Sequence, residues 1–570
     1  MIRARIACVL FFALTAIAAD VTVENNVAMK TRDGVTLRAD IYRPKADGKF
    51  PVLLERTPYN KNAGESEFGM RAAALGYVVI VQDVRGRFTS EGEWYPFKHE
   101  SNDGYDTVEW AAALPYANGK VGMIGASYVG ATQMLAAIAH PPHLAGIFPV
   151  VTASNYHDGW TYQGGAFEQW FNESWTSGLV QDTLDRRARE SVNALKWVWK
   201  LPLTDYPFLD VPSPASLAPY FADWARHPDF DGYWREWSIE DRYANINVLA
   251  YCVGGWYDIF QGGTIRNYVG LKSRAPGQRL MIGPWYHGPF DGQAGELNFG
   301  AASKGDTDTE QLRWYDHLLR GVANGVEHEK PVKLFVMGRN VWRDEDDWPL
   351  ARARATRYYL GSAGGANTRT GDGTLSTSAP AGGHSDRYTY DPANPTPTRG
   401  GGLCCDNDHL PSGAFDQRTV EERKDVLVYT TPEFTSDFEV TGPIAAELYV
   451  GSSAVDTDFT AKLVDVWPNG FAQNLTDGIL RARYRNSHAH PEPMKPGEVY
   501  KIRIDMWNTS NVFLAGHKLR LELSSSNFPR FDRNLNTGEN AGTSSNIVKA
   551  ENTIYHDAQH PSVLILPVLP

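Results

Sequence analysis

The sequence predicts a three-part protein: an α/β core, a helical insertion within that core, and a carboxy-terminal β-sandwich. Three changes of pattern along the chain lead to this prediction. Short apolar runs first alternate with helical patterns, which is typical of a parallel sheet covered by helices. A helical stretch then interrupts the strands. Beyond it the chain consists of short strands separated by Gly, Pro, Asn and Asp turns.

Residues 1–19 have the pattern of a secretory signal peptide. Arg3 and Arg5 precede an apolar run, and the small residues of "AIAA" suit cleavage near Ala18 or Ala19. The apolar run is too short for a stable transmembrane helix, and no later stretch is long and apolar enough to span a membrane. We therefore expect a soluble protein that is secreted or periplasmic. An uncleaved amino-terminal anchor is the alternative.

The predicted core occupies residues 20–154 and 244–331. It begins with a hairpin around "RDG" and continues with buried strands such as "PVLLER" and "YVVIVQD". Helical patterns start at Asp103 and Tyr128, and strands resume with "INVLAYCVGGW" and "RLMIGPW". The pattern "TEQLRWYDHLLRGVANG", with its terminal glycine stop, predicts the last helix of the core.

Residues 155–243 are predicted to form a helical cap over the ends of the core strands. The patterns "GGAFEQWFNESW" and "LDRRARESVNALKWVWKLP" are typical of helices, and aromatic residues gather there. Residues 332–570 are predicted to form the β-sandwich, which we expect to be jelly-roll-like. Its strands include "DVLVYTT", "TGPIAAELYVGS" and "HKLRLELSSS".

The formal net charge of −12 argues against a protein that binds nucleic acid electrostatically. Beyond the leader the chain carries Cys252, Cys404 and Cys405, which are too few for a disulfide framework and lack metal-ligand spacing. Because a bond between neighbouring cysteines is strained, we expect Cys404 and Cys405 to be buried or free. The sequence assigns no chemistry to them.

The stretch "VGMIGASYVGATQ" predicts a sharp turn between a buried strand and a helix, with Ser127 at its tip. Gly125 and Gly130 leave room for the close approach of strand and helix that such a turn requires. The turn would project the Ser127 hydroxyl above the sheet and aim the N–H of Tyr128 at whatever binds there. Alone, this G-x-S-x-x-G pattern is weak evidence of catalysis.

A serine nucleophile requires a base that is held in place by an acid. In α/β-hydrolase folds these partners follow the serine in the order Asp or Glu, then His, each in a loop after a strand. Asp258 follows the strand "VLAYCVGGWY", and His287 follows the strand "RLMIGPWY". Taken singly, Asp258 could cap a helix and His287 could be a surface or packed histidine. Together their order and context predict a triad with Ser127 in an α/β-hydrolase core.

The signatures "GASYVG", "GGWYDIF" and "GPWYHG" resemble those of the cocaine esterase and NonD (CocE/NonD) hydrolases. That family includes α-amino-acid ester hydrolases, glutaryl-cephalosporin acylases and X-Pro dipeptidyl-peptidase relatives. The similarity continues through "RTPYNK", "QDVRGRFTSEGEW" and "DTDFTAKLVDVWPNG". It implies that Ser127 is the nucleophile, His287 the general base and Asp258 its orienting acid. It also implies an oxyanion hole formed by the Tyr128 N–H and the Tyr59 hydroxyl.

Trp256 and Trp285 lie beside the triad partners in the sequence and are predicted to line the substrate pocket. The cap residues Trp160, Trp170 and Trp175 are left undecided. For the charged residues of "QDVRGRFTSEGEW" we favour a structural ion-pair network over a clamp for a substrate carboxylate. No carboxylate closely follows the predicted nucleophile, which weakens an amino-acid ester substrate without excluding it.

The sequence therefore predicts an exported serine hydrolase that acts through an acyl-enzyme on an ester or amide of a small molecule or short peptide, without a metal or cofactor. An X-Pro dipeptidyl-peptidase or another amino-terminal exopeptidase on the same scaffold is the alternative. A non-catalytic surface protein that binds sugar or protein is the alternative from another class. The physiological substrate and the oligomeric state, including a homo-oligomer, stay open.

Overall fold

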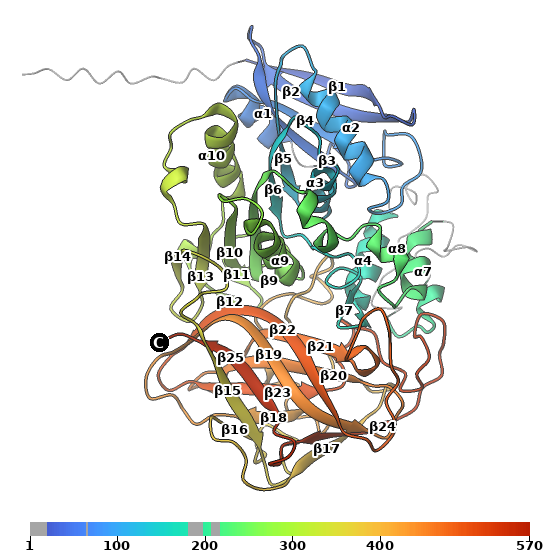
Figure 1. The fold of residues 1–570 in the computed structure, drawn as a ribbon, viewed down its shortest axis with the longest axis vertical. Helices are drawn as coiled ribbons and strands as arrows, with labels where there is room; N and C mark the ends of the chain where they lie inside the picture. The colour runs from blue at the N-terminus through green and yellow to red at the C-terminus, as the bar shows by residue number, and fades with distance from the viewer. Residues whose placement is uncertain (1–19, 64–65, 181–197, 207–216) are drawn as a thin grey trace, which may run out of the picture.

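The computed structural model describes residues 20–63, 66–180, 198–206 and 217–570, which form a core, a cap and a carboxy-terminal β-domain (Figure 1). The predicted signal peptide lies outside the described residues, as does most of the helix predicted from "LDRRARESVNALKWVWKLP". None of the described helices combines the length and the apolar character needed to cross a membrane.

A ten-stranded sheet forms the core, in the order β1-β2-β4-β3-β5-β6-β9-β10-β13-β14. The strands from β4 to β13 in this order pair in parallel, and the edge pairings are antiparallel. Because parallel strands end at one edge of a sheet, the loops that follow β3, β5, β9 and β10 lie near one another. The strands are β1 (Val21–Lys30), β2 (Thr36–Pro44), β3 (Phe50–Thr57), β4 (Val78–Asp83), β5 (Ala117–Ala126), β6 (Leu144–Val150), β9 (Leu249–Tyr257), β10 (Arg279–Tyr286), β13 (Val332–Val336) and β14 (Val341–Glu345).

Helices cover both faces of this sheet. On β3, Leu53 packs in the cluster that includes α1 and α10, whereas its neighbour Leu54 packs in the cluster that includes α2, α3 and α9. This burial on both faces explains why the sequence of β3 is a continuous apolar run rather than an alternating one. The helices are α1 (Ser66–Ala74), α2 (Glu100–Ala112), α3 (Tyr128–Ile138), α9 (Gln261–Lys272) and α10 (Thr307–Arg320).

The core sheet extends beyond the boundary that the sequence predicted at residue 332. β13 pairs in parallel with β10, and β14 returns antiparallel after a turn in which Gly338 has a φ of 81°. The strands of the second large sheet begin with β15 (Arg354–Gly361). A short apolar run such as "VKLFV" is equally typical of both kinds of sheet, so the sequence alone does not assign β13 to one of them.

The cap between β6 and β9 contains a short hairpin followed by helices, and α4 corresponds to the pattern "GGAFEQWFNESW". Many of its aromatic side chains are packed inward, with Trp160, Trp170 and Trp224 fully buried, whereas Trp199 is exposed. The cap elements are β7 (Tyr162–Gln163), β8 (Ala166–Phe167), α4 (Gln169–Leu179), α7 (Pro219–Arg226), α8 (Gly232–Arg235) and the 3-10 turns η1 (Leu203–Asp205) and η3 (Glu240–Asn245).

The carboxy-terminal domain consists of strands that connect into one sheet, drawn at the bottom of Figure 1. This sheet folds back on itself, since β21 packs against β22 although the two are not paired. The strands are β15, β16 (Thr374–Ser376), β17 (Ser385–Tyr390), β18 (Leu427–Thr430), β19 (Phe438–Ser452), β20 (Asp458–Val466), β21 (Ala472–Arg481), β22 (Tyr500–Phe513), β23 (Lys518–Ser524), β24 (Ala550–Tyr555) and β25 (Val563–Val568).

Cys404 and Cys405 form a disulfide with each other, contrary to the prediction from sequence. Cys404 is buried, whereas Cys405 is exposed and has a left-handed φ of 77°. The prediction was wrong because neighbouring cysteines need an unusual turn to meet, and no glycine or other residue beside them indicates that turn. Cys252 is buried in β9 as a free thiol.

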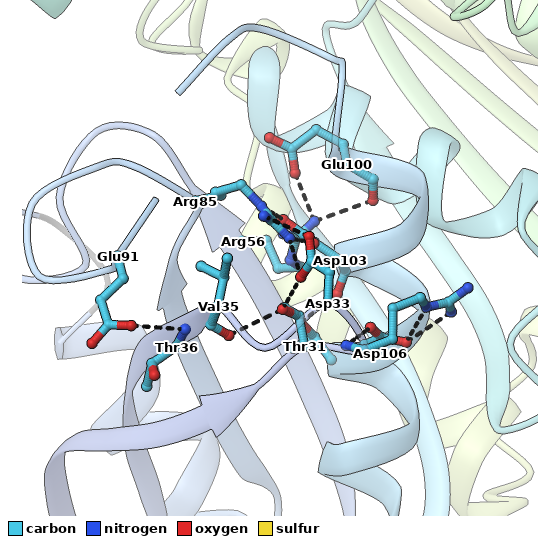
Figure 2. Close-up of polar contacts among 12 residues, drawn as sticks. Thr31, Asp33, Val35, Thr36, Arg56, Arg85, Glu91, Glu100, Asp103 and Asp106 are labelled. Carbon is cyan, nitrogen blue, oxygen red and sulfur yellow. Dashed lines mark hydrogen bonds and ion pairs between the residues drawn. The ribbon is translucent and has the colours of Figure 1, made fainter. Parts of the chain in front are cut away.

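Two arginines join the core sheet and its loops to α2 (Figure 2). Arg56 of β3 is fully buried and donates to Glu100 at 2.7 Å. Arg85, in the loop after β4, pairs with Asp103 at 2.7 Å and with Asp33 at 2.9 Å. Burial raises the pKa of Glu100, although the nearby Arg56 acts to lower it. Arg85, in the charged segment after β4, thus belongs to a structural ion-pair network, which is the role that we favoured from the sequence.

We expect Arg56→Met to destabilise the fold strongly, because it leaves the buried Glu100 carboxyl without its cation. Removal of one partner of a buried pair costs about 3–5 kcal/mol. The matched control is Arg32→Met, which breaks the exposed pair between Arg32 and Asp106 and should cost about 0–1 kcal/mol. Thermal unfolding followed by circular dichroism compares the two variants. Equal midpoints would contradict the structural role of Arg56.

Candidate active site

Ser127 occupies the sharp turn between β5 and α3. Its φ of 62° and ψ of −125° are unusual for a residue with a side chain, and its N–H donates to the Val150 carbonyl at 2.9 Å. A Cβ on Gly125 would lie 2.2 Å from Cγ1 of Val129, and one on Gly130 would lie 2.8 Å from Cβ of Thr152. Both glycines are therefore required by the close passage of strand and helix, as the sequence pattern indicated.

His287 and Asp258 reach Ser127 from the loops after β10 and β9. His287 Nδ1 lies 2.7 Å from Asp258 Oδ1, and His287 Nε2 lies 2.9 Å from Ser127 Oγ. The Asp258 side chain is fully buried, and its other oxygen accepts the backbone N–H of Phe260 at 3.1 Å. An Nδ1–H donated to this carboxylate leaves Nε2 as the acceptor for the serine hydroxyl. The hydroxyl, imidazole and carboxylate thus form one hydrogen-bonded row.

Tyr59 lies in the loop after β3, and its hydroxyl faces both Ser127 and the N–H of Tyr128. The hydroxyl accepts the indole N–H of Trp175, a cap residue, at 3.0 Å. Burial raises the pKa of the Tyr59 phenol above its usual value, while its hydrogen bonds to Trp175, Ser127 and Tyr128 act to lower it. The phenol is therefore protonated at neutral pH and can donate a hydrogen bond beside Ser127.

The Tyr128 side chain points away from this group and into the core. Its hydroxyl donates to Glu100 at 3.0 Å and accepts the N–H of Phe97 at 2.8 Å. Burial raises the pKa of this phenol well above its usual value. Since Glu100 also pairs with Arg56, the buried pair drawn in Figure 2 is connected to the residue that follows Ser127. Only the backbone N–H of Tyr128 is placed to act next to Ser127.

Two hollows flank the turn at Ser127. One, of about 410 Å³, is lined by His287 and by Asp308 of α10, and the other, of about 370 Å³, is lined by Ser127 and Tyr59. Both are also lined by Glu55, which lies at the end of β3. The residues directly after Ser127 in the sequence include no carboxylate. Glu55 was missed because its proximity to Ser127 results from the parallel pairing of β3 with β5.

Aromatic rings of the cap and core pack next to His287. Phe260 meets the His287 ring edge-to-face at 5.2 Å, and Trp160 of the cap stacks on Phe260 at 4.5 Å. Trp175 packs at 5.6 Å from Trp160 and contacts Tyr59 through its indole N–H. Two cap tryptophans that the sequence left undecided thus lie close to the candidate site. Phe260 was not singled out, although it stands only two residues after Asp258.

Trp256 and Trp285 do not line either hollow at Ser127, so the prediction for these residues is wrong. Trp256 is buried and donates to the Phe335 carbonyl at 2.7 Å. Trp285 is buried, donates to the Ser303 carbonyl at 2.6 Å and stacks on Phe290. Both follow the predicted strands, but their side chains pack into the core. Position next to a functional residue in the sequence does not determine which face a side chain occupies.

Within the described ranges, no cluster of three or more His, Cys, Asp or Glu side chains is arranged to hold a metal ion. The arrangement that is present is a polarised serine with hydrogen-bond donors beside it. Such a group can perform nucleophilic acyl transfer.

A parallel α/β core with this turn, followed by an all-β domain, defines a serine hydrolase of the α/β-hydrolase type. Comparison with known proteins supports this class. Residues 33–289 match the family described as X-Pro dipeptidyl-peptidase (S15 family), and residues 324–565 match the X-Pro dipeptidyl-peptidase C-terminal non-catalytic domain. A cocaine esterase from Rhodococcus sp. is 40% identical over 96% of this chain and 99% of its own length.

Comparison with solved structures supports the same class of protein. An aminopeptidase from a marine sediment archaeon of the Thaumarchaeota has a TM-score of 0.81 at 25% identity, over 100% of this chain and 99% of its own. An α-amino-acid ester hydrolase has a TM-score of 0.79 at 25% identity, over 99% and 98% of the two chains. A CocE/NonD family hydrolase from Staphylococcus aureus shares the fold, with a TM-score of 0.71, over 96% and 94%. The chain belongs to the CocE/NonD family of serine hydrolases, as its sequence motifs indicated.

Proposed function

We propose that this protein is an exported esterase in which Ser127, His287 and Asp258 form the catalytic triad. The observation that carries the proposal is the hydrogen-bonded row, with 2.9 Å between Ser127 Oγ and His287 Nε2 and 2.7 Å between His287 Nδ1 and Asp258 Oδ1. Both distances allow proton transfer from the serine to the imidazole and stabilisation of the resulting imidazolium.

In the first half of the reaction, Ser127 Oγ attacks the carbonyl carbon of the ester while His287 Nε2 takes its proton. The carbonyl oxygen becomes negative and accepts hydrogen bonds from the Tyr59 hydroxyl and the Tyr128 N–H. The imidazolium then donates its proton to the departing alcohol, and an acyl-serine remains. In the second half a water molecule attacks the acyl carbon, His287 accepts its proton, and the acid leaves as Ser127 regains its hydrogen.

An ester with an aromatic or apolar acyl group suits the surroundings of this row. Val81, Ala126 and Val129 line the hollow that contains Ser127 and Tyr59, where they can pack against an acyl group. The relative with 40% identity is a cocaine esterase, which supports an ester rather than a peptide as the substrate of this chain as well.

Export is proposed from the pattern of residues 1–19, with cleavage near Ala19. The disulfide between Cys404 and Cys405 supports this proposal, because disulfides persist mainly in secreted and periplasmic proteins.

An amino-terminal exopeptidase is the second candidate, and Glu55 is the observation that favours it. Glu55 lines both hollows beside Ser127, so its negative charge lies near the place that the free ammonium group of such a substrate would occupy. The structural similarity to the Thaumarchaeota aminopeptidase agrees with this candidate. The ester proposal takes precedence because of the higher sequence identity to an esterase.

A fluorophosphonate probe tests the proposed nucleophile. We expect the wild-type protein to be labelled and Ser127→Ala to be unlabelled, because the probe reacts only with a serine that a base activates. Ser273→Ala, which changes an exposed serine after α9, is the matched control and should label like the wild type. Labelling is measured by intact-protein mass spectrometry. Equal labelling of Ser127→Ala would exclude Ser127 as the nucleophile, and an unreactive wild type would favour a non-catalytic binding protein.

Tyr59→Phe tests the proposed oxyanion donor. Loss of one such donor typically lowers kcat by about a hundred- to a thousandfold, so we expect a loss of that size with little change in KM. Trp175→Phe removes the indole N–H that reaches Tyr59 but keeps the phenol, and it should retain much more activity. Steady-state kinetics with an aryl ester measure both variants. A Tyr59→Phe enzyme with wild-type kcat would exclude the phenol as a donor.

Substrate pairs separate the two candidate functions. We expect a higher kcat/KM for an aryl ester than for a Gly-Pro anilide, because the apolar side chains in the hollow at Ser127 suit an apolar acyl group. If the exopeptidase candidate is correct instead, only the anilide is cleaved. Glu55→Gln then lowers its kcat/KM by about 10- to 100-fold, as expected for loss of a charged hydrogen bond of about 1.5–3 kcal/mol.

A further inference from the structure

The proposed mechanism does not involve the disulfide between Cys404 and Cys405. This disulfide lies in a loop of the carboxy-terminal domain, residues 401–413, which we call the 401–413 loop. The loop is closed at its base by two backbone hydrogen bonds between Gly401 and Gly413, of 2.7 and 2.9 Å. Its disulfide joins the buried Cys404 to the exposed Cys405. One sulfur-bearing residue is therefore accessible to solvent, while the other is part of the protein interior.

The same loop lies directly on the backbone of the proposed triad acid. Leu403, next to Cys404, forms an isolated parallel β-bridge with Asp258. A Cβ on Gly402 would lie 3.2 Å from the carbonyl oxygen of Asp258 and 3.3 Å from Cα of Ile259, so the two backbones are in close contact. A shift of residues 402–404 would therefore displace the backbone of Asp258.

Further contacts connect the disulfide turn to the rest of the molecule. The Leu403 carbonyl accepts the Ser412 hydroxyl at 2.9 Å, within the loop. The Cys404 carbonyl lies 3.5 Å from the hydroxyl of Ser174, which belongs to the cap helix α4. The disulfide thus lies where the carboxy-terminal domain meets both the core and the cap.

The backbone at the disulfide adopts a conformation that reduction would release. Cys405 has a φ of 77°, a left-handed conformation that is unfavourable for a residue with a side chain. A covalent bond between neighbouring side chains closes a small ring that restricts the backbone to such turns. Without that bond, residues 404 and 405 can return to common backbone conformations, and Leu403 can move with them.

We propose that the Cys404–Cys405 disulfide is a redox-sensitive positioning element, which holds Leu403 against Asp258 and so aligns Asp258 with His287. This inference rests on the proposed triad. Oxidation maintains the alignment, and reduction loosens it and lowers the rate of acyl transfer. The two cysteines act through Asp258 and do not touch the reacting atoms.

The reduction is a two-electron exchange with a dithiol. One thiolate of the dithiol attacks a sulfur of the pair and breaks the Cys404–Cys405 bond, forming a mixed disulfide. The second thiol of the reductant then displaces the attacked cysteine. The products are two cysteine thiols, which carry the two protons of the dithiol, and the cyclic disulfide of the reductant. Cys252 does not compete, because it is buried and burial raises the pKa of its thiol to about 12.

The test compares oxidised and dithiothreitol-reduced protein, with thiol titration to count the released thiols. We expect two additional thiols and a fall in kcat/KM for an aryl ester of about 10- to 100-fold, the size typical of small misplacements in active sites. Reoxidation should restore the rate. Cys404→Ser/Cys405→Ser should remain at the reduced level and no longer respond to dithiothreitol. Cys252→Ala is the matched control and should respond like the wild type.

Active-site titration with the fluorophosphonate distinguishes a positioning role from simple loss of folded protein. If reduction displaces only Asp258, Ser127 is still labelled in full but more slowly, and kcat per labelled site falls with little change in KM. Partial unfolding would lower the number of sites that can be labelled and leave kcat per remaining site unchanged.

Two results would overturn the inference. The first is release of two thiols with no change in kcat/KM or in kcat per labelled site. The second is a Cys404→Ser/Cys405→Ser protein with the wild-type rate per labelled site. In both cases labelling of Ser127 by the fluorophosphonate shows that the proposed function still holds. If oxidised wild-type protein is not labelled at all, the proposed function fails first and this inference fails with it.

Discussion

The structure depends on one constraint, the common direction of the parallel core strands. β5, β9 and β10 run side by side or close together in the sheet order and end at the same edge, so the loops that follow them converge. Ser127, Asp258 and His287 are far apart in the sequence but stand on these three loops. The order of the strands therefore explains how their side chains come within 2.7 and 2.9 Å of one another. Tyr59 joins them in the same way from the end of β3.

The tight turn at Ser127 requires stabilising contacts from the residues packed around it, because its backbone conformation is unfavourable for a residue with a side chain. Two kinds of contact supply it. Gly125 and Gly130 allow the strand and helix to approach, and the Tyr128 side chain is held by Glu100, which in turn pairs with Arg56. Burial of this pair is costly unless its hydrogen bonds are made. The polar network under the sheet edge is thus part of what keeps the serine in place.

The sequence predicted proximity correctly where it depends on short local patterns and on strand order. The Ser127 turn is encoded within six residues, and Asp258 and His287 each follow an apolar run directly. It did not predict features that depend on side-chain direction or non-local packing. Trp256 and Trp285 stand beside Asp258 and His287 in the sequence but point into the core, and Glu55 approaches Ser127 only through the pairing of β3 with β5. The secretory leader remains a prediction from sequence.

The carboxy-terminal domain matches a family described as non-catalytic, yet its contacts reach the proposed acid of the triad. Leu403 bridges Asp258, and the hydroxyl of Tyr257, one residue earlier, donates to the Asn474 carbonyl and accepts from Gln473 on β21. The loop after β9 is therefore packed between two domains rather than supported by the core alone. Because Asp258 contacts His287, the geometry of the proposed active site depends on contacts from both the core and the carboxy-terminal domain. A domain can thus contribute no reacting atom and still determine how well the reacting atoms are aligned.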